Sequence, residues 1–235
     1  MTNTDPKRVM VIMAHPDDPE FFTGGTIALW VREGAEIIYL ILTNGNKGSD
    51  DPEMTPEQLT KLRQEEQRTA AGLLGVKTII FLDEPDGELQ VTLRLRQQVV
   101  REIRRHRPDV IICPDPSVFY FGDTYINHPD HRAAGQVALE AIFPAARNAM
   151  YHPELLGEGL VPYAVREIYL AGSSQPNRWV DITDVMDIKI QAIQSHASQL
   201  PDPQSTIERV RQRAEAVDEY GRSVYREAFH RLTIR

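Results

Sequence analysis

The sequence predicts an α/β fold in which a mainly parallel sheet is covered by helices on both faces. Short apolar runs alternate with longer helical segments from the start of the chain to about residue 150. The apolar runs lack an alternation of polar and apolar residues, which indicates strands buried on both faces. Strands and helices that alternate in this way form parallel sheets between layers of helices.

The first half of the chain contains four expected strands, at 8–14, 35–43, 78–82 and 109–113. Helices are expected between them, at 23–33, 55–74 and 92–105. Gly34 and Gly75 suit the ends of the first two helices. Thr55 opens the second with a Thr-x-x-Gln capping box, and Pro108 ends the third.

The second half is less regular. A long loop leads to a helix that Pro144 is expected to interrupt, and the later elements are a strand and two helices. The second of these helices starts at Ser205, where Ser-x-x-Glu forms another capping box. No break in composition marks a boundary, so residues 1–235 are expected to form one domain with a C-terminal helical segment from about residue 183. The expected ranges are 114–129 for the loop, 130–150 for the interrupted helix, 165–171 for the strand and 183–200 for the next helix.

Composition argues against several classes of function. The chain has 235 residues, 41% of them hydrophobic and 26% charged, and a formal net charge of −8. This charge disfavours binding to nucleic acid or to anionic membranes, and no apolar run approaches the length of a membrane span. Cys113 is the one cysteine, which excludes an intrachain disulfide. Residues 1–8 lack the apolar core of a signal peptide, so a cytoplasmic protein is expected.

Ionisable residues gather where the first expected strand ends. His15, Asp17 and Asp18 follow its apolar run directly, although such groups are costly in a core. Catalytic zinc usually takes three nitrogen or oxygen ligands from the protein. His15 and Asp18 offer two, and the segment Asn127–His131, which follows the fourth strand, offers a third. Ligands of open α/β sheets bind at the carboxyl ends of the strands, so these two segments should meet.

The residue types also suggest separate roles. His131, in the first turn of a helix, is the candidate third ligand, while His128 precedes that helix and stays free for another role. Asp17, beside the metal but not bound to it, can accept a proton from a metal-activated water. Asn44 and Asp86 also follow expected strands and should lie on the same face.

The segment His15-Pro-Asp-Asp together with His128-x-x-His131 resembles the paired motifs of the LmbE-like, or PIG-L, deacetylases. These are zinc-dependent enzymes that remove the acetyl group from N-acetylglucosamine-type substrates. The resemblance implies a Rossmann-like three-layer fold and one zinc ion per chain. It covers most of the chain and extends to Gly24–Thr26, Thr43–Gly45, Arg63-x-x-Glu66, Leu74-Gly75, Phe81-Leu82, Asp86-Gly87, Arg107–Asp109, Val180–Thr183, Lys189 and Ser198-Gln199.

The resemblance also implies roles for individual residues. His15, Asp18 and His131 would be the zinc ligands and Asp17 the general base. His128 would act as an acid or stabilise the oxyanion of the tetrahedral intermediate.

Further residues are expected near the ligands or the substrate. Asp130 matches a position that orients His128, although it could simply favour the N-terminus of its helix. Arg63 matches an arginine that reaches the site in relatives, whereas its charged surroundings alone would indicate a solvated helix face. His196 faces inward, either as a core histidine or as a substrate contact. Glu20 lies one step further from the aspartates than in the shorter family motif and is assigned no catalytic role.

The sequence therefore predicts a zinc-dependent hydrolase that removes an acetyl group from an N-acetylated amino sugar or its conjugate. The alternatives are a non-hydrolytic zinc-binding protein and a nucleotide-binding α/β protein. Substrate specificity is expected in the loops 44–55, 114–127 and 151–163. The resemblance also predicts a homo-oligomer, a trimer or hexamer. The amphipathic helix after Ser205 would serve its interface or pack against its own domain.

Overall fold

The computed structural model describes residues 8–234, and part of the stretch on which the signal-peptide expectation rests, residues 1–7, lies outside this range. Its main strands are β1 (Arg8–Met13), β2 (Glu36–Thr43), β3 (Thr78–Glu84), β4 (Val110–Pro114), β7 (Glu167–Ala171), β8 (Arg178–Asp181), β9 (Glu215–Val217) and β10 (Ser223–Thr233). They form an eight-stranded sheet in the order β3-β2-β1-β4-β7-β10-β8, with β9 paired to β10. The five strands from β3 to β7 are parallel, and β10 runs antiparallel to its neighbours.

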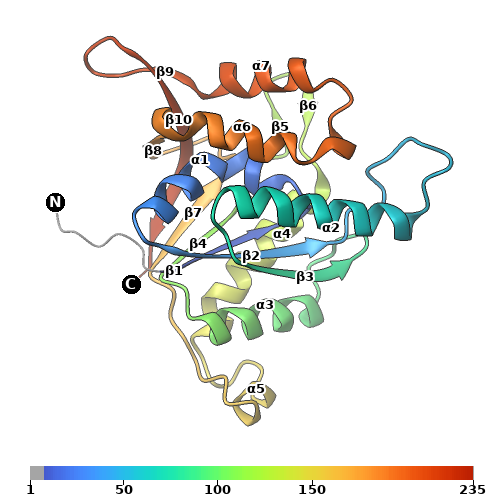
Figure 1. The fold of residues 1–235 in the computed structure, drawn as a ribbon. Coiled ribbons are helices and arrows are strands. Elements are labelled where there is room, and N and C mark those ends of the chain that lie inside the picture. Colours follow the sequence, from blue (N-terminus) through green and yellow to red (C-terminus); the bar gives the residue numbers. More distant parts are fainter. Residues whose placement is uncertain (1–7, 235) are drawn as a thin grey trace.

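The longer helices are α1 (Asp18–Arg32), α2 (Pro56–Leu73), α3 (Leu93–His106), α4 (Pro129–Glu140), α6 (Met186–Gln194) and α7 (Pro203–Ala214). Helices α1, α2, α6 and α7 contribute to the hydrophobic cluster on one face of the sheet, and α3 and α4 to the cluster on the other. Figure 1 shows these layers above and below the sheet. The predicted α/β class, with helices on both faces of a mainly parallel sheet, is confirmed.

Strand β1 illustrates why this chain forms a three-layer structure. Val9, Val11 and Met13 belong to one hydrophobic cluster, while Met10 and Ile12 belong to the other. Successive side chains of a strand point to opposite faces, so a continuous apolar run requires cover on both. The strand that ends at the candidate site is thereby fixed from two sides.

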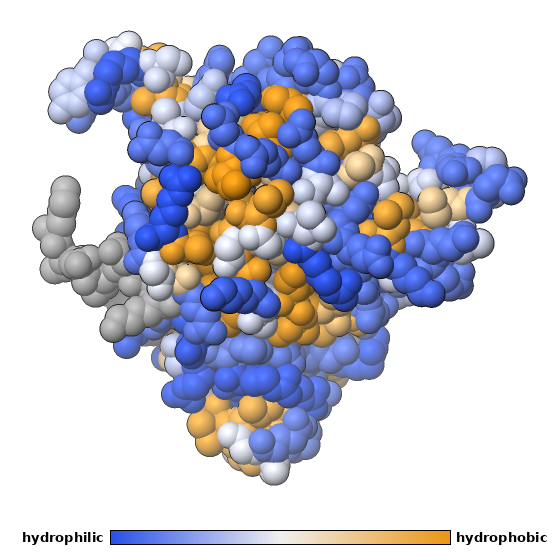
Figure 2. All heavy atoms as spheres, in the orientation of Figure 1, coloured by the Kyte–Doolittle hydropathy of each residue, from blue (hydrophilic) through white to orange (hydrophobic). Residues whose placement is uncertain are grey.

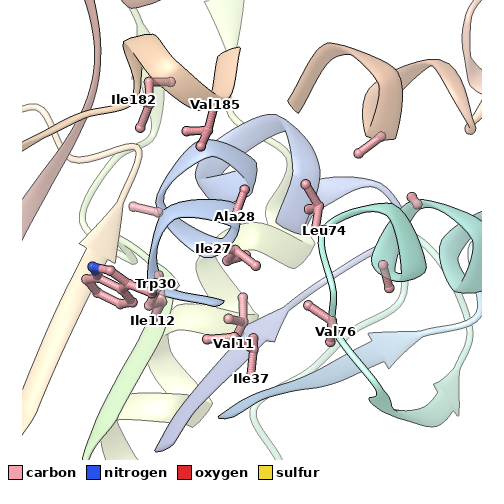
Figure 3. Close-up of a cluster of buried hydrophobic side chains, with 14 of the residues drawn as sticks. Val11, Ile27, Ala28, Trp30, Ile37, Leu74, Val76, Ile112, Ile182 and Val185 are labelled. Carbon is pink, nitrogen blue, oxygen red and sulfur yellow. The ribbon is translucent and has the colours of Figure 1, made fainter. Parts of the chain in front are cut away.

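Helix α1 packs closely against the sheet on one side and a C-terminal segment on the other. In Figure 3, Ile27 and Ala28 lie between Val11 of β1 and the segment that carries Ile182 and Val185. Gly25 permits this approach, because a Cβ there would lie 2.7 Å from atoms of Ile182. The helix that begins at the candidate site is therefore packed between β1 and the segment that follows β8.

Several element boundaries differ from the prediction. Helix α1 begins at Asp18 rather than near residue 23, because Pro19 suits a first turn and the acidic Asp18 and Glu20 favour a helix N-terminus. The expected interruption near Pro144 is found: α4 ends at Glu140, and the irregular turn η1 (Ala141–Ala146) contains Phe143 with non-helical dihedrals.

The long loop before α4 contains structure that was not predicted. Residues Tyr120–Phe121 (β5) and Tyr125–Ile126 (β6) form a small antiparallel hairpin. Its turn contains Gly122, with a φ of +55°. Hairpin strands this short carry no periodicity that a sequence could reveal.

The largest correction concerns the C-terminal helical segment expected from about residue 183. The expected helix over 183–200 is divided into η2 (Thr183–Val185), α6 and η3 (Ala197–Gln199), and α7 is followed by strands β9 and β10. Strand β10 carries charged residues such as Glu227 and Arg231, so it lacks the apolar run that marks the parallel strands. It is held by pairing with β7 and β8, which depends on tertiary structure.

Helix α7 packs against its own domain, one of the two alternatives for the amphipathic helix. Its buried residues are Thr206, Val210 and Ala214, and the last two belong to the cluster that includes α1. Among the described residues, no helix has the length and apolar character needed to cross a membrane. The short α5 (Glu154–Gly157) completes the helices.

Candidate metal and active site

The candidate metal ligands come from the two places where buried strands end. Strand β1 leads directly into the turn that carries His15, and α1 begins at Asp18. His131 lies in the first turn of α4, which packs beside the end of β4. Gly135 makes that approach possible, because a Cβ there would lie 2.2 Å from the carbonyl oxygen of Pro114. The neighbouring positions of β1 and β4 in the sheet thus bring the two motifs together.

His15, Asp18 and His131 form a buried cluster of possible metal ligands. One ligand atom from each lies within 4.8 Å of the others. Nε2 of His131 is 3.0 Å from Oδ1 of Asp18, and Nδ1 of His15 is 3.4 Å from Oδ2. Two imidazole nitrogens and one carboxylate are a common ligand set of catalytic zinc. The structure therefore brings the three predicted ligands together.

The second nitrogen of each histidine ring is also held. Nδ1 of His131 lies 2.9 Å from Oδ1 of Asn127, and Nε2 of His15 lies 3.2 Å from Oδ2 of Asp130 and 3.1 Å from Oδ1 of Asp86. Histidines that bind metals usually donate their other ring N–H to such an acceptor, which fixes the tautomer and the orientation of the ring. The donor set and its supporting residues fit a metal ion.

Neighbouring charges and hydrogen bonds shift the pKa values of the cluster. Burial opposes a charge on Asp18, but the charge of His131 and the hydrogen bonds from His131 and His15 hold the pKa of Asp18 well below its usual range. Burial likewise lowers the pKa of His15, but hydrogen bonds to Asp130, Asp18 and Asp86 outweigh it and raise that pKa well above the ordinary value. The carboxylate form that a metal requires is thus the stable form of Asp18.

Asp17 lies beside this cluster in a strained backbone conformation, with φ 111° and ψ −33°. Its carboxylate accepts a hydrogen bond of 3.2 Å from Arg63, which also donates to the carbonyl oxygens of Pro16 and Gly45. Burial raises the pKa of Asp17, and the charge of Arg63 opposes that rise. Arg63 is 3% exposed, so it lies at the site and not on a solvated helix face.

His128 is the most exposed of the three histidines, with 38% of its side chain accessible. It is the N-cap residue of α4, and its Nδ1 accepts a hydrogen bond from the backbone N–H of Asp130 at 3.2 Å. Burial and the charge of His15 lower the pKa of His128, which favours the neutral ring. A neutral ring that accepts at Nδ1 carries its proton on Nε2. That N–H is available as a donor beside the metal cluster.

The structure connects Asp130 primarily to His15 rather than to the ring of His128. Its carboxylate accepts hydrogen bonds from the N–H groups of Gly87 and Leu89 and contacts Nε2 of His15, whereas Nδ1 of His128 is 4.0 Å away. The contact with His128 instead involves the Asp130 N–H. The role expected for Asp130 in orienting His128 stays a prediction, and the backbone N–H of Asp130 is the group that contacts the His128 ring.

Two other predicted residues lie behind the site. Asn44 accepts a hydrogen bond from the N–H of Asn46, whose side chain in turn holds the N–H of Asp86. His196 is fully buried and lies 3.1 Å from Glu20, as a core histidine does. In the part of the chain that the structure describes, neither residue lines the cavity described next. Asp86 does line it.

A cavity of about 830 Å³ opens over His15, Asp17, Asp18, His128 and His131. The expected loops 44–55 and 114–127 contribute Lys47, Gly48, Phe121 and Tyr125. The third expected loop, 151–163, lines none of it among the described residues, and its part in specificity stays a prediction. The C-terminal region, which was not predicted to line the site, also contributes Lys189, Gln199, Val210, Arg213, Ala214, Arg226, Glu227 and Ala228.

Arg226, Glu227 and Ala228 escaped prediction because β10 was not recognised as a strand, and the other five lie on α6, η3 and α7, whose packing depends on tertiary structure. Lys189 and Gln199 stand at positions that match the family, and this match was the only sequence signal that could have assigned them to the site. Glu227 carries no comparable local signal, yet it accepts hydrogen bonds from the N–H groups of Gly25 and Thr26 and from Lys189. Strand β10 and helix α6 are thereby tied to α1.

Comparison with known proteins extends the resemblance. The sequence profile of the family described as PIG-L: GlcNAc-PI de-N-acetylase matches residues 10–142. Diacetylchitobiose deacetylase of Thermococcus kodakarensis is 38% identical over 198 residues, which cover 84% of this chain and 72% of the relative.

Two solved structures are similar over nearly the whole chain. N,N'-diacetylchitobiose deacetylase from Pyrococcus horikoshii, complexed with its inhibitor MPG, has a TM-score of 0.88 and 33% identity, and the match covers 97% of this chain and 85% of that one. GalB, the 4-carboxy-2-hydroxymuconate hydratase from Pseudomonas putida KT2440, has a TM-score of 0.77 and 25% identity, with 97% of each chain covered.

Proposed function

Because this chain belongs to the PIG-L family of GlcNAc-PI de-N-acetylases, we propose that it is a zinc-dependent N-deacetylase. Its substrate would be an N-acetylated amino sugar or a conjugate of one, and the products would be acetate and a free amine. The observation that carries the proposal is the buried cluster of His15, Asp18 and His131 at the floor of the cavity. The similarity to two chitobiose deacetylases supports the substrate class.

In this proposal His15, Asp18 and His131 hold one zinc ion. Zinc in such a site polarises a carbonyl oxygen and lowers the pKa of a water towards about 7. The support for zinc over other divalent ions is the donor set, since imidazole nitrogens with one carboxylate are typical of catalytic zinc and less suited to magnesium or calcium. The paired second nitrogens of both rings support the same assignment.

Asp17 is the proposed general base. Its carboxylate is adjacent to the cluster of His15, Asp18 and His131 but is not one of its possible ligands, so it is free to take a proton from the attacking water. The raised pKa of Asp17 makes it a stronger base than an ordinary aspartate. Arg63 keeps the carboxylate charged and oriented before the transfer.

His128 is the proposed partner of the substrate oxygen. Its Nε2–H would donate a hydrogen bond to the oxyanion of the tetrahedral intermediate, and the same nitrogen could pass a proton to the leaving amine. The low pKa of His128 supports the first of these roles, because a neutral ring donates without adding a charge.

The size of the cavity supports a sugar conjugate as substrate. Its volume of about 830 Å³ lies in the upper part of the range of small-molecule sites, which is about 300–1,000 Å³. Phe121 and Tyr125 line one side and offer aromatic surfaces on which a sugar ring can pack. Arg213 and Arg226 also line the cavity and offer hydrogen-bond donors to a polar substrate.

A panel of N-acetyl sugars tests the proposal. Purified zinc-loaded protein should release acetate and a free amine in equal amounts from at least one member, such as diacetylchitobiose. Asp17→Asn should keep its zinc and lose about 10²- to 10⁴-fold in kcat. Loss of zinc together with activity would identify Asp17 as a ligand. Addition of water to an unsaturated acid without any acetate release would favour a hydratase, the activity in the name of one structural neighbour.

The homo-oligomer, a trimer or hexamer, stays a prediction. Figure 2 shows hydrophobic residues gathered across the centre of one face, and Tyr120 and Ile126 of the β5–β6 hairpin are exposed. Exposed apolar groups of this kind often mark protein interfaces. Light scattering should give three or six times the mass of one chain, and a monomer at working concentration would contradict it.

A further inference from the structure

We propose that Gln67 is a positioning residue that holds the general base Asp17 in its strained conformation, and that Glu20 and His196 anchor Gln67. The proposal rests on the proposed function, because it assigns a purpose to residues that support Asp17. It goes beyond the family motif, in which neither Gln67 nor the buried Glu20–His196 pair was assigned a catalytic task.

The backbone of Asp17 needs support. A φ of 111° lies in a region that residues with a Cβ rarely adopt, and such conformations persist only where the surroundings enforce them. The side chain of Gln67 accepts a hydrogen bond of 2.9 Å from the N–H of Asp17 through its Oε1. Without this acceptor, the Asp17 N–H has no other partner in the hydrogen bonds of the described residues, and the turn loses its restraint.

Gln67 is itself fixed from behind. Its Nε2 donates to both carboxylate oxygens of Glu20 at 3.0 Å, and Oε2 of Glu20 lies 3.1 Å from Nε2 of His196. All three side chains are 0% exposed. The orientation of the Gln67 amide is determined by its neighbours, because a flipped amide would direct its NH₂ at an N–H and its oxygen at a carboxylate. The chain Asp17–Gln67–Glu20–His196 therefore has one consistent arrangement.

The hydrogen-bonded series Asp17–Gln67–Glu20–His196 connects three helices to the turn that carries Asp17. Asp17 precedes α1, Glu20 is in the first turn of α1, Gln67 is in α2, and His196 follows α6. Arg63, one turn before Gln67 in α2, holds the other side of the same turn through Pro16 and the Asp17 carboxylate. Helix α2 thus makes hydrogen bonds to Asp17 at two points, its backbone N–H and its carboxylate.

Gln67 makes no hydrogen bond to the proposed metal ligands, His15, Asp18 and His131, among the described residues. Loss of the Gln67 amide should therefore shift the base without removing the metal. Catalytic groups that are displaced by about 1 Å can lose about 10²-fold in rate, so a change in kcat is the expected signature.

The test is a double-mutant cycle with Gln67→Met and Asp17→Asn. Methionine keeps the length and apolar stem of glutamine but offers no strong acceptor. Q67M should lower kcat by about 10- to 100-fold, change KM by less than about threefold and keep one zinc per chain. The visible spectrum of the cobalt-substituted protein should stay the same, because the ligands do not move. In the D17N background the same change should cost less than about twofold, since two residues that act as a unit are non-additive.

The matched control is Gln64→Met, which lies in the same helix and donates to Asp83 near the surface. Q64M should leave kcat and KM as in the wild type. Full activity in folded Q67M, or equal losses in the wild-type and D17N backgrounds, would overturn the proposal. Activity that D17N leaves intact would instead show that the proposed base is wrong.

If Q67M fails to fold, Glu20→Gln decides. This variant keeps the shape of the side chain and one acceptor for Gln67 but removes the charge that anchors it. A two- to fivefold lower kcat with unchanged zinc content is the expected result, on the order of one weakened hydrogen bond. An unchanged kcat would contradict the proposal.

Discussion

The region from β1 to α4 and the region from α6 to β10 contribute to the same cavity in different ways. In the first, the possible ligand atoms of His15, Asp18 and His131 lie within 4.8 Å of one another, and these residues line the cavity. In the second, Lys189 and Glu227 form a buried pair whose hydrogen bonds end on the backbone of α1. The first region contains the proposed metal ligands and base, and the second holds in place the helix that begins at them.

The two regions also obey different rules of construction. The reactive groups follow the ends of parallel strands, where any α/β sheet gathers its loops. The supporting groups lie on β10, which pairs antiparallel with β7 and β8, and on α6, which packs against α1 and α2. Chemistry in this fold is thus set by local motifs, whereas its support depends on contacts between distant parts of the chain.

The largest expected effect comes from removing one of the proposed metal ligands. His131→Ala should abolish zinc binding and lower turnover by roughly a thousandfold or more, because it removes one of three protein ligands from a buried site. Zinc per chain by elemental analysis and acetate release are the two measurements. Full activity in this variant would show that the region from β1 to α4 does not supply the metal ligands that catalysis needs.

A variant in the supporting region should act on stability instead. Lys189→Met leaves the 5%-exposed Glu227 without its cationic partner, and loss of one member of a buried pair costs about 3–5 kcal/mol. Urea unfolding should show this loss while zinc per chain stays the same. The double variant K189M/E227Q should cost less than the sum of the two single changes. Loss of zinc from K189M without a loss of stability would instead show that Lys189 supports metal binding.

The smallest expected effect concerns the Glu20–His196 pair. Burial lowers the pKa of His196, but the hydrogen bond and charge of Glu20, with the charges of Asp17 and Glu66, outweigh it and raise that pKa above its ordinary value. A raised pKa means that the folded state binds the proton more tightly than the unfolded state. The stabilisation is therefore complete below the unfolded pKa and is lost as the pH rises through the folded pKa.

Unfolding in urea measures this dependence. Between about pH 6 and about pH 9, metal-free wild type should lose more unfolding free energy than His196→Gln, in which the titrating group is absent. The opposite sign would show that His196 is neutral in the folded protein near pH 6 and would weaken its part in the chain behind Asp17.

Sequence reasoning succeeded where local patterns determine the structure. The apolar runs of β1, β2 and β4 require burial on both faces, and the Thr55 capping box with Pro56 defines the start of α2. His15 and His131 follow strands that are neighbours in a parallel sheet, so their meeting could be anticipated. The residue types and the family resemblance both separate Asp17, as the base, from the metal ligands, and this assignment stays a prediction.

Other features depend on tertiary contacts that no local pattern records. Glu227 looks like an exposed charge in a mixed sequence, yet it is buried because the N–H groups of Gly25 and Thr26 and the amine of Lys189 converge on it. Gln67 lies in a charged stretch of α2 and is buried because Asp17 and Glu20 lie opposite. Polar residues enter a core only with partners, and those partners are known only from the fold.

The most direct test of the account is the metal dependence of deacetylation. Acetate and free amine released from an N-acetyl sugar are measured for the purified protein, for the protein after removal of metal with a chelator, and after zinc is added back. The account predicts equal amounts of both products, loss of release on chelation, and recovery at one zinc per chain. Release that is unaffected by complete removal of the metal would contradict it.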